Sequence, residues 1–164
     1  IVIHKTTHFT KEEMEGITKG LAGVDNIELL QIQEFSAWRA IRFQNDVATL
    51  FPIQRGTVIP LDKDTFLIWT HGSVQHDELA GKNLNYYKNG RGIPAPLLVK
   101  RFMGKSSALE LVNEILMLTK MNWNSGDGLY KILPVTLDFA KALSRVAKQD
   151  LVVYDRPYNF RYFM

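Results

Sequence analysis

The segment PAPLLVKRFMGKSSALELVNEILMLTK (residues 94–120) contains both kinds of element from which the fold can be predicted. Its apolar first part predicts a strand over residues 94–102. Ser107 and Glu110 then have the spacing of a capping box, and they open a helix that we predict to run to residue 123. A strand followed directly by an amphipathic helix is typical of an α/β domain. The predicted buried face of this helix comprises Ala108, Leu111, Val112, Ile115 and either Leu118 or Thr119.

The same alternation of strands and helices extends through the rest of the chain. Thr10 and Glu13 form another capping box, which begins a helix that Gly23 is placed to end. A last helix follows Pro134, and a long polar loop is expected over residues 75–93. Because strands and helices alternate, we predict an α/β domain with a mixed sheet flanked by helices. Further strands are predicted over residues 1–4, 26–34, 38–43, 55–61, 65–72, 130–133 and 151–155, with the pair around residues 62–64 forming a hairpin.

Length and composition fit one compact domain, since the chain has 164 residues of which 46% are hydrophobic. It contains no cysteine, which excludes disulfides and thiolate metal sites and is compatible with a reducing, cytoplasmic compartment. No apolar run approaches the roughly 20 residues that span a bilayer, so no membrane partner is expected. The sequence starts without Met inside a strand-like run, and we expect it to be the C-terminal part of a longer chain.

Basic residues are concentrated in the second half of the sequence. Residues 1–87 carry eight Lys and Arg against eleven Asp and Glu, whereas residues 88–164 carry twelve against six. The first half therefore has a net charge of −3 and the second a net charge of +6. Such asymmetry is typical of a surface that meets a polyanion, and a solvated basic face is the alternative.

Three cations lie on one side of the last predicted helix, and we call Lys141, Arg145 and Lys148 the basic ridge. At about 100° per residue they fall within an arc of roughly 60°, opposite the apolar positions. The apolar arc comprises Phe139, Ala140, Leu143, Val146 and Ala147. Asp138 is the one acid near the ridge in sequence, and it lies close to the helix N-terminus, where the helix dipole already favours it. Neighbouring cations repel one another unless an anion lies across them, so phosphate is a candidate ligand, and a solvated face is again the alternative.

Several stretches of the chain together resemble the second half of the PIWI domain of Argonaute proteins. IVIHKTTHFTKEEMEGI (residues 1–17) resembles the family's strand that ends in an Arg-Asp-Gly triplet and leads into a helix. RGTVIPLDKDTFLIWTHGSVQ (residues 55–75) is similar to its Gly-Thr strand and the strand that follows. PAPLLVKRF, a helix ending LTKMNWN, and LPVTLDFAKAL resemble the strand and helices that complete the domain, and the final YFM resembles its aromatic C-terminus. The resemblance identifies residues 1–164 as the C-terminal portion of a PIWI domain.

This resemblance implies an RNase H-like fold. Active members cut a target strand with acidic residues and a final Asp or His that hold two divalent metal ions. In this sequence Lys5 stands at the Asp of the triplet, and Lys141 stands seven residues after Pro134, where the last ligand is expected. A protonated amine cannot ligate a metal ion, so we expect slicing to be lost. An active nuclease that uses other acids, such as Asp138, is the alternative.

An inactive member of the family is expected to keep guide-directed pairing, in which bases supply the specificity and the protein reads backbone and duplex shape. The resemblance implies a compact prokaryotic Argonaute that senses invading nucleic acid together with an effector. Its expected partners are a guide RNA or DNA, a DNA or RNA target, and the MID domain of the same protein. A third reading makes this half a docking surface for the effector, centred on residues 75–92.

The predicted binding residues follow from charge and from the resemblance. Arg145 is favoured for the 5′ phosphate of the guide because its forked guanidinium suits phosphate, and Lys148 is next. In some prokaryotic members the C-terminal carboxylate ligates a divalent cation that bridges guide phosphates, which makes Met164 the expected ligand for Mg²⁺. The full predicted set of nucleic-acid contacts is Lys5, Arg55, Thr70, Lys120, Lys141, Arg145 and Lys148.

Overall fold

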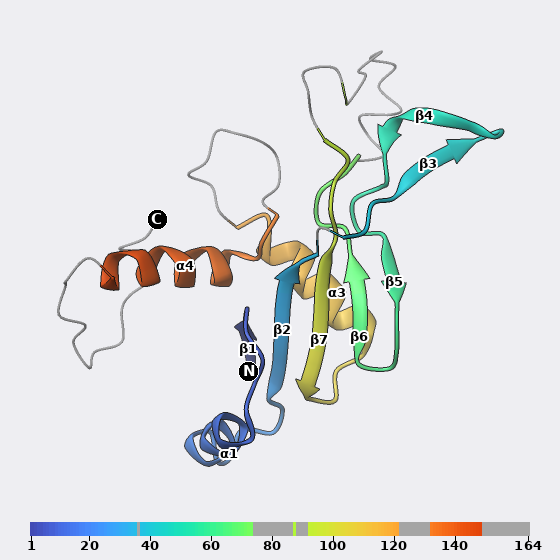
Figure 1. Cartoon of the computed structure of the whole chain (residues 1–164). Coiled ribbons are helices and arrows are strands. Elements are labelled where there is room, and N and C mark those ends of the chain that lie inside the picture. Colours follow the sequence, from blue (N-terminus) through green and yellow to red (C-terminus); the bar gives the residue numbers. More distant parts are fainter. Residues whose placement is uncertain (36, 74–86, 88–91, 122–131, 149–164) are drawn as a thin grey trace.

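A five-stranded mixed sheet forms the centre of the computed structural model, which describes residues 1–35, 37–73, 87, 92–121 and 132–148 (Figure 1). The strand order is β1-β2-β7-β6-β5. β1 runs parallel to β2, and every other neighbouring pair is antiparallel. The predicted α/β class with a mixed sheet is therefore confirmed. The strands are β1 (Val2–Lys5), β2 (Glu28–Glu34), β5 (Val58–Pro60), β6 (Thr65–Ile68) and β7 (Leu97–Met103).

Three helices are described: α1 (Lys11–Gly20), α3 (Ala108–Leu118) and α4 (Val135–Ala147). Both predicted capping boxes are present, with Thr10 and Glu13 at the start of α1 and Ser107 and Glu110 at the start of α3. α3 ends at Leu118, five residues before the predicted end. Among these helices none has the length and apolar character needed to cross a bilayer.

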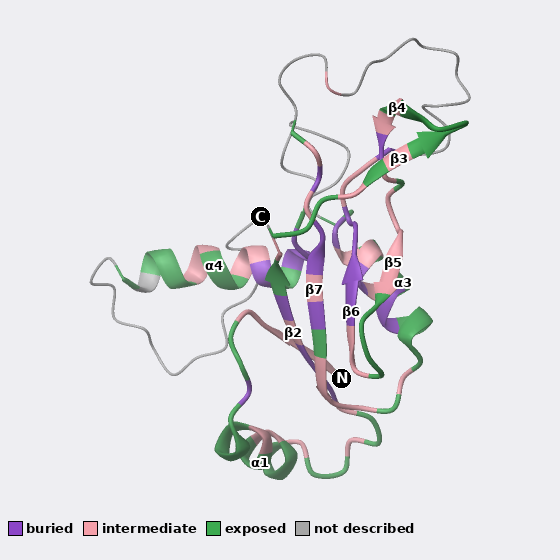
Figure 2. Cartoon of the chain, turned by 45° about the vertical axis from the view of Figure 1, so that its right-hand side comes forward, coloured by how far each residue is buried: buried purple, intermediate pink, exposed green. Residues whose placement is uncertain are grey.

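The hydrophobic core lies between α3 and one face of the sheet (Figure 2). Alternate residues of the central strands point into it, as the period of two requires. From α3, the predicted Leu111, Val112 and Ile115 are buried and Thr119 closes the stripe, whereas Ala108 is exposed, contrary to prediction. The strand residues of the core are Leu30, Ile32, Phe66, Ile68, Leu97 and Val99.

A separate hairpin of β3 (Ile41–Gln44) and β4 (Val47–Pro52) extends away from this sheet (Figure 1). β3 overlaps the strand predicted over residues 38–43, but β4 was not predicted. Asn45 and Asp46 connect the strands with φ values of 51° and 60°, the backbone of a type I′ turn. This Asn-Asp pair was the sequence signal for the hairpin.

α4 is anchored by its first turn and then projects beyond the sheet edge (Figure 1). Leu133, Val135 and Leu137 are buried, and Leu133 and Leu137 join the core. Further along α4, Phe139 and Leu143 of the apolar arc are half-buried, whereas Ala140 and Val146 are exposed.

At one end of the sheet, the carboxylate of Glu28 on β2 binds the segment that connects β7 to α3. This side chain is 1% exposed at the start of β2, and its Oε1 accepts hydrogen bonds of 2.7 Å from the backbone amides of Lys105 and Ser106. Burial on its own would raise the pKa of Glu28, but the hydrogen bonds from Ser106 and Lys105 outweigh it and hold the pKa below its usual value. The chain between β7 and the start of α3 is thus bound to an anion on β2.

Gly104 provides a stability test of this joint. Its φ is +134°, and a Cβ there would overlap the Glu28 carboxylate. We expect Gly104→Ala to lower the free energy of unfolding by about 2 kcal/mol or more, because the side chain both strains the backbone and displaces a buried charge. Urea denaturation followed by circular dichroism measures the change.

Gly16→Ala is the matched control. Gly16 lies within α1, and nothing lies within 4 Å of a Cβ built there, so alanine should be neutral or stabilise the helix by about 0.5–1 kcal/mol. Equal denaturation midpoints for the two variants would contradict the role assigned to the Glu28 joint.

Candidate nucleic-acid interface

The carboxyl ends of the parallel strands β1 and β2 lie next to the first turns of α4. Lys5 ends β1 and Glu34 ends β2. α4 approaches this edge through Thr136, whose hydroxyl is 2.9 Å from Nδ1 of His4. The chain thereby brings the segments around Lys5 and Lys141 to the same edge of the sheet, although 136 positions separate them in sequence. This edge is the candidate interface.

Lys5 is held by contacts within the protein. Its Nζ donates to the carbonyl oxygen of His8 at 3.1 Å, forms a hydrogen-bonded ion pair with Glu13, and lies 5.3 Å from the centre of the Phe9 ring. The hydrogen bond from Lys5 is the main reason that the pKa of Glu13 lies below its usual value. Sequence analysis identified Glu13 only as a helix cap and missed its second role.

Lys141 also has an acidic partner, although the sequence showed only Asp138 near the basic ridge. Its Nζ lies 3.4 Å from Oε1 of Glu34, a residue 107 positions away. The prediction examined only acids near Lys141 on the same helix, so a partner on β2 could not be found. Arg145 and Lys148 are exposed, and within the described part of the chain neither has an ion pair.

His4 lies between β1 and α4 and is largely removed from water. Desolvation lowers its pKa from 6.5 to about 4, so the ring is neutral at neutral pH. As adjacent residues of a strand, His4 and Lys5 point to opposite faces of the sheet. Because the two side chains point to opposite faces, His4 contacts α4 and Lys5 contacts α1. No contact between Lys5 and Lys141 occurs among the described residues, and each lysine has its own carboxylate.

Arg55, another predicted phosphate contact, binds the end of α3. Its Nη2 donates to the carbonyl oxygen of Leu116 at 2.8 Å and to Oγ1 of Thr119 at 2.7 Å. A cation at this position adds a donor to one of the last carbonyl groups of α3 and suits the negative end of the helix dipole. Arg55 thus has a structural role that sequence analysis missed, and its contact with nucleic acid stays a prediction.

The remaining predicted binding residues are Thr70, Lys120 and Met164. Thr70 is 1% exposed, and its hydroxyl donates to the carbonyl oxygen of Ile132 at 2.6 Å. Lys120 is exposed just beyond α3. Met164 and most of the loop over residues 75–92 lie outside the described residues. The predicted contacts of Thr70 and Lys120 with nucleic acid, and of Met164 with Mg²⁺, stay predictions.

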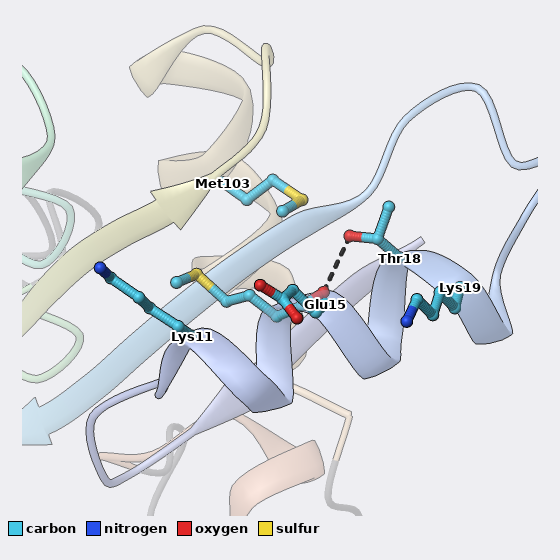
Figure 3. A pocket seen from close by; sticks show the side chains of 6 residues that line it. Lys11, Glu15, Thr18, Lys19 and Met103 are labelled. Atoms are coloured by element: carbon cyan, nitrogen blue, oxygen red, sulfur yellow. Dashed lines mark hydrogen bonds between the residues drawn. The ribbon is translucent and has the colours of Figure 1, made fainter.

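A shallow depression lies away from this edge, between α1 and the end of β7 (Figure 3). Met14 and Met103 provide its apolar surface, Lys11, Glu15 and Lys19 flank it, and the hydroxyl of Thr18 is turned back to the Met14 carbonyl oxygen at 2.8 Å. None of the predicted binding residues lines it. In the described ranges, no group of three or more His, Asp or Glu side chains converges in a way that could hold a metal ion.

Comparison with solved structures identifies the fold. The chain is similar to Aa-Ago in a crystal structure with externally bound siRNA, with a TM-score of 0.59 and 21% sequence identity. It is also similar to *Clostridium butyricum* Argonaute bound to a guide DNA and a 19-mer target DNA, with a TM-score of 0.64 and 15% identity. The likenesses cover 92% and 90% of this chain. No protein-family model and no curated protein matches the chain.

These likenesses show that the chain has the fold of a segment of an Argonaute, as the resemblance predicted. The segment is short relative to those proteins, since it spans 18% of the length of Aa-Ago and 17% of the length of the *C. butyricum* protein. At such low sequence identity, the likeness concerns the arrangement of strands and helices. A function inferred from this fold therefore needs support from the chain's own residues.

The burial of His4 gives a prediction for acid stability. The unfolded chain takes up a proton on this ring near pH 6.5, whereas the folded protein takes it up only near pH 4. The free energy of unfolding should therefore decrease as the pH falls from 6.5 towards 4, by at most about 1.4 kcal/mol per pH unit from this residue. Denaturant titrations at a series of pH values measure the slope.

His4→Asn is the comparison variant, because asparagine keeps a polar group near Thr136 and does not titrate. Its free energy of unfolding should vary less with pH than that of the original protein between pH 6.5 and 5, above the range in which carboxylates titrate. Identical slopes would contradict the assigned burial of a neutral His4.

Proposed function

We propose that this chain is a nucleic-acid-binding module of a guide-dependent, catalytically silent prokaryotic Argonaute. The observation that carries the proposal is the fold, because over nine tenths of the chain it matches proteins whose structures contain siRNA or a guide and target DNA. The net positive charge of residues 88–164 supports a polyanionic partner. Base pairing with the guide then supplies sequence specificity, and the protein binds the backbone.

The basic ridge on α4, which consists of Lys141, Arg145 and Lys148, is the proposed contact with the phosphate backbone. Arg145 and Lys148 are exposed in the part of α4 that projects beyond the sheet, where a ligand can approach them (Figure 1). Arg145 can donate two parallel hydrogen bonds to one phosphate, and Lys148 adds a point charge one turn further along. Lys141, nearer the sheet, extends the ridge towards the edge that carries Lys5. Together these residues present cations over several turns of one helix.

The chemistry of the side chains supports the loss of slicing. Two-metal cleavage needs carboxylate or imidazole ligands that fix the ions, and the resemblance assigns two such positions to Lys5 and Lys141. Both lysines are paired with glutamates, and an ammonium group has no lone pair to offer a metal ion. Asp138 does not complete a metal-binding group within the described part of the chain. Lys5 and Lys141 themselves therefore cannot serve as ligands of the two metal ions.

The remaining parts of the proposal concern partners. The 5′ phosphate of the guide is assigned to Arg145 and Lys148 together with a MID domain of the same protein. Mg²⁺ at the C-terminal carboxylate of Met164 would neutralise guide phosphates there. An associated effector would convert target recognition into a defence response in the cytoplasm.

Recovery of nucleic acid from the cell tests binding. Purified full-length protein should carry short strands with a uniform 5′ end, as sequencing of the extracted nucleic acid will show. Replacement of the three ridge residues by glutamate should reduce the recovered amount at least about tenfold, because several phosphate contacts become repulsive.

The control variant introduces the same charge change on other exposed lysines. It replaces Lys11, Lys19 and Lys63 by glutamate. Both variants should fold with unchanged circular dichroism, and only the ridge variant should lose its nucleic acid. Equal loss in both variants would indicate a general charge effect, and recovery of no nucleic acid from the original protein would overturn the proposal.

Catalytic silence is tested separately. The full-length protein loaded with a guide should leave a matched, labelled target strand intact in Mg²⁺ and in Mn²⁺, as measured by denaturing gel electrophoresis. Cleavage at one fixed position would overturn this part of the proposal. Asp138→Asn would then show whether that acid takes part, as the alternative reading requires.

A further inference from the structure

We propose that Glu13 and Glu34 are built-in competitors of phosphate, which hold Lys5 and Lys141 in the free protein and release them when a nucleic-acid backbone arrives. The inference rests on the proposed function and adds a regulatory pair to the same edge of the sheet. In both cases a lysine that we assign to phosphate already contacts one glutamate. A carboxylate carries the charge that a phosphodiester carries, so the two anions compete for the same ammonium group.

Glu13 is fixed in place by α1. One of its oxygens, Oε2, accepts a hydrogen bond of 2.8 Å from the backbone amide of Thr10 and thereby completes the capping box. The other oxygen, Oε1, contacts Nζ of Lys5. The helix cap holds the Glu13 carboxylate at a defined position. Because this side chain is already ordered, little conformational entropy is lost when Lys5 pairs with it again.

Lys5 retains enough exposure to change partners. Its side chain is 30% exposed, and that of Glu13 is 42% exposed. The Phe9 ring and the carbonyl oxygen of His8 fix the position of the ammonium group independently of Glu13. A phosphate that displaces the carboxylate would therefore find Lys5 already placed.

The pair of Lys141 and Glu34 is more open. The two side chains are 48% and 55% exposed, and their charged atoms are 3.4 Å apart. An exposed pair of this kind is weak and exchanges readily, because water screens it. The pair nevertheless occupies Lys141, so a phosphate must displace the Glu34 carboxylate before it can bind this lysine.

The ion pair between Arg101 and Asp64 differs from these two pairs because its cation is less exposed. Arg101 pairs with Asp64 at 3.2 Å and also donates to the carbonyl oxygen of Ser106 at 2.7 Å, and its side chain is only 21% exposed. This arginine joins β7 to the turn before β6 and to the segment that precedes α3. It is part of the Glu28 joint and is not free to bind a ligand, in contrast to Lys5 and Lys141.

The closing experiment uses Glu13→Gln and Glu34→Gln, singly and together, in the full-length protein. Glutamine keeps the capping box of α1 while it removes the negative charge. The probe is a short guide strand with a 5′ phosphate, paired with a labelled complement, and fluorescence anisotropy gives Kd over a series of salt concentrations. Each substitution should tighten binding by about two- to fivefold, in proportion to the strength of an exposed ion pair.

The salt dependence distinguishes competition from a structural effect. When Lys5 leaves Glu13 for a phosphate, the freed carboxylate takes up a cation and offsets the counterion released from the nucleic acid. The plot of log K against log salt should therefore become steeper in the variants, by up to about one per glutamate. A change that acted only through folding would not alter this slope.

Glu110→Gln is the matched control. Glu110 occupies the same capping-box position on α3, its hydrogen bonds join it to Ser107, and among the described residues no lysine pairs with it. This variant should change neither Kd nor the slope. Unchanged or weaker binding by the Glu13 and Glu34 variants, beside an original protein that binds, would overturn the competition alone. Failure of the original protein and of the double variant to bind the probe would overturn both proposals.

Discussion

The burial of one carboxylate constrains how this domain is assembled. Glu28 brings a negative charge into the interior at the start of β2, and an uncompensated charge there would cost several kcal/mol. The amides of Lys105 and Ser106 compensate it, so the chain that leaves β7 must pass directly over the start of β2. Gly104 makes this approach sterically feasible. α3 begins immediately afterwards, and its buried face is thereby aligned with the core side of the sheet.

The two ends of the sheet differ in how their charges are satisfied. At the Glu28 end, the carboxylate and the Arg101 guanidinium are buried or half-buried and bonded to backbone groups, so they stabilise the fold in one arrangement. At the opposite end, where β1 and β2 finish, the ion pairs of Lys5 and Lys141 are partly exposed and contact side chains. Exposed pairs contribute little to stability and can exchange partners. The first end thus fixes the architecture, and the second carries two of the residues that we propose to bind phosphate.

Local patterns allowed much of the fold to be predicted from the sequence. Both capping boxes, the hairpin around residues 62–64 and the core stripe of α3 depend on residues close together in the chain, and the structure contains them. Contacts between residues far apart in the chain could not be predicted from local patterns. The partner of Lys141 is Glu34, 107 positions away, and the ligands of Arg55 are more than 60 positions away. The β3–β4 hairpin was missed for another reason, since its turn residues Asn45 and Asp46 were overlooked.

The anchoring of α4 explains why its cations differ from one another. Only the start of the helix is buried against the core, through Leu133 and Leu137, so Lys141 remains within reach of the sheet and finds Glu34 there. Arg145 and Lys148 lie one and two turns further out, beyond the sheet edge and its carboxylates. A helix that crossed the sheet along its whole length would have brought those cations to acidic partners or buried its apolar arc. Along the projecting helix, the ridge therefore changes from a lysine paired with Glu34 to two exposed cations that have no ion pair within the described part of the chain.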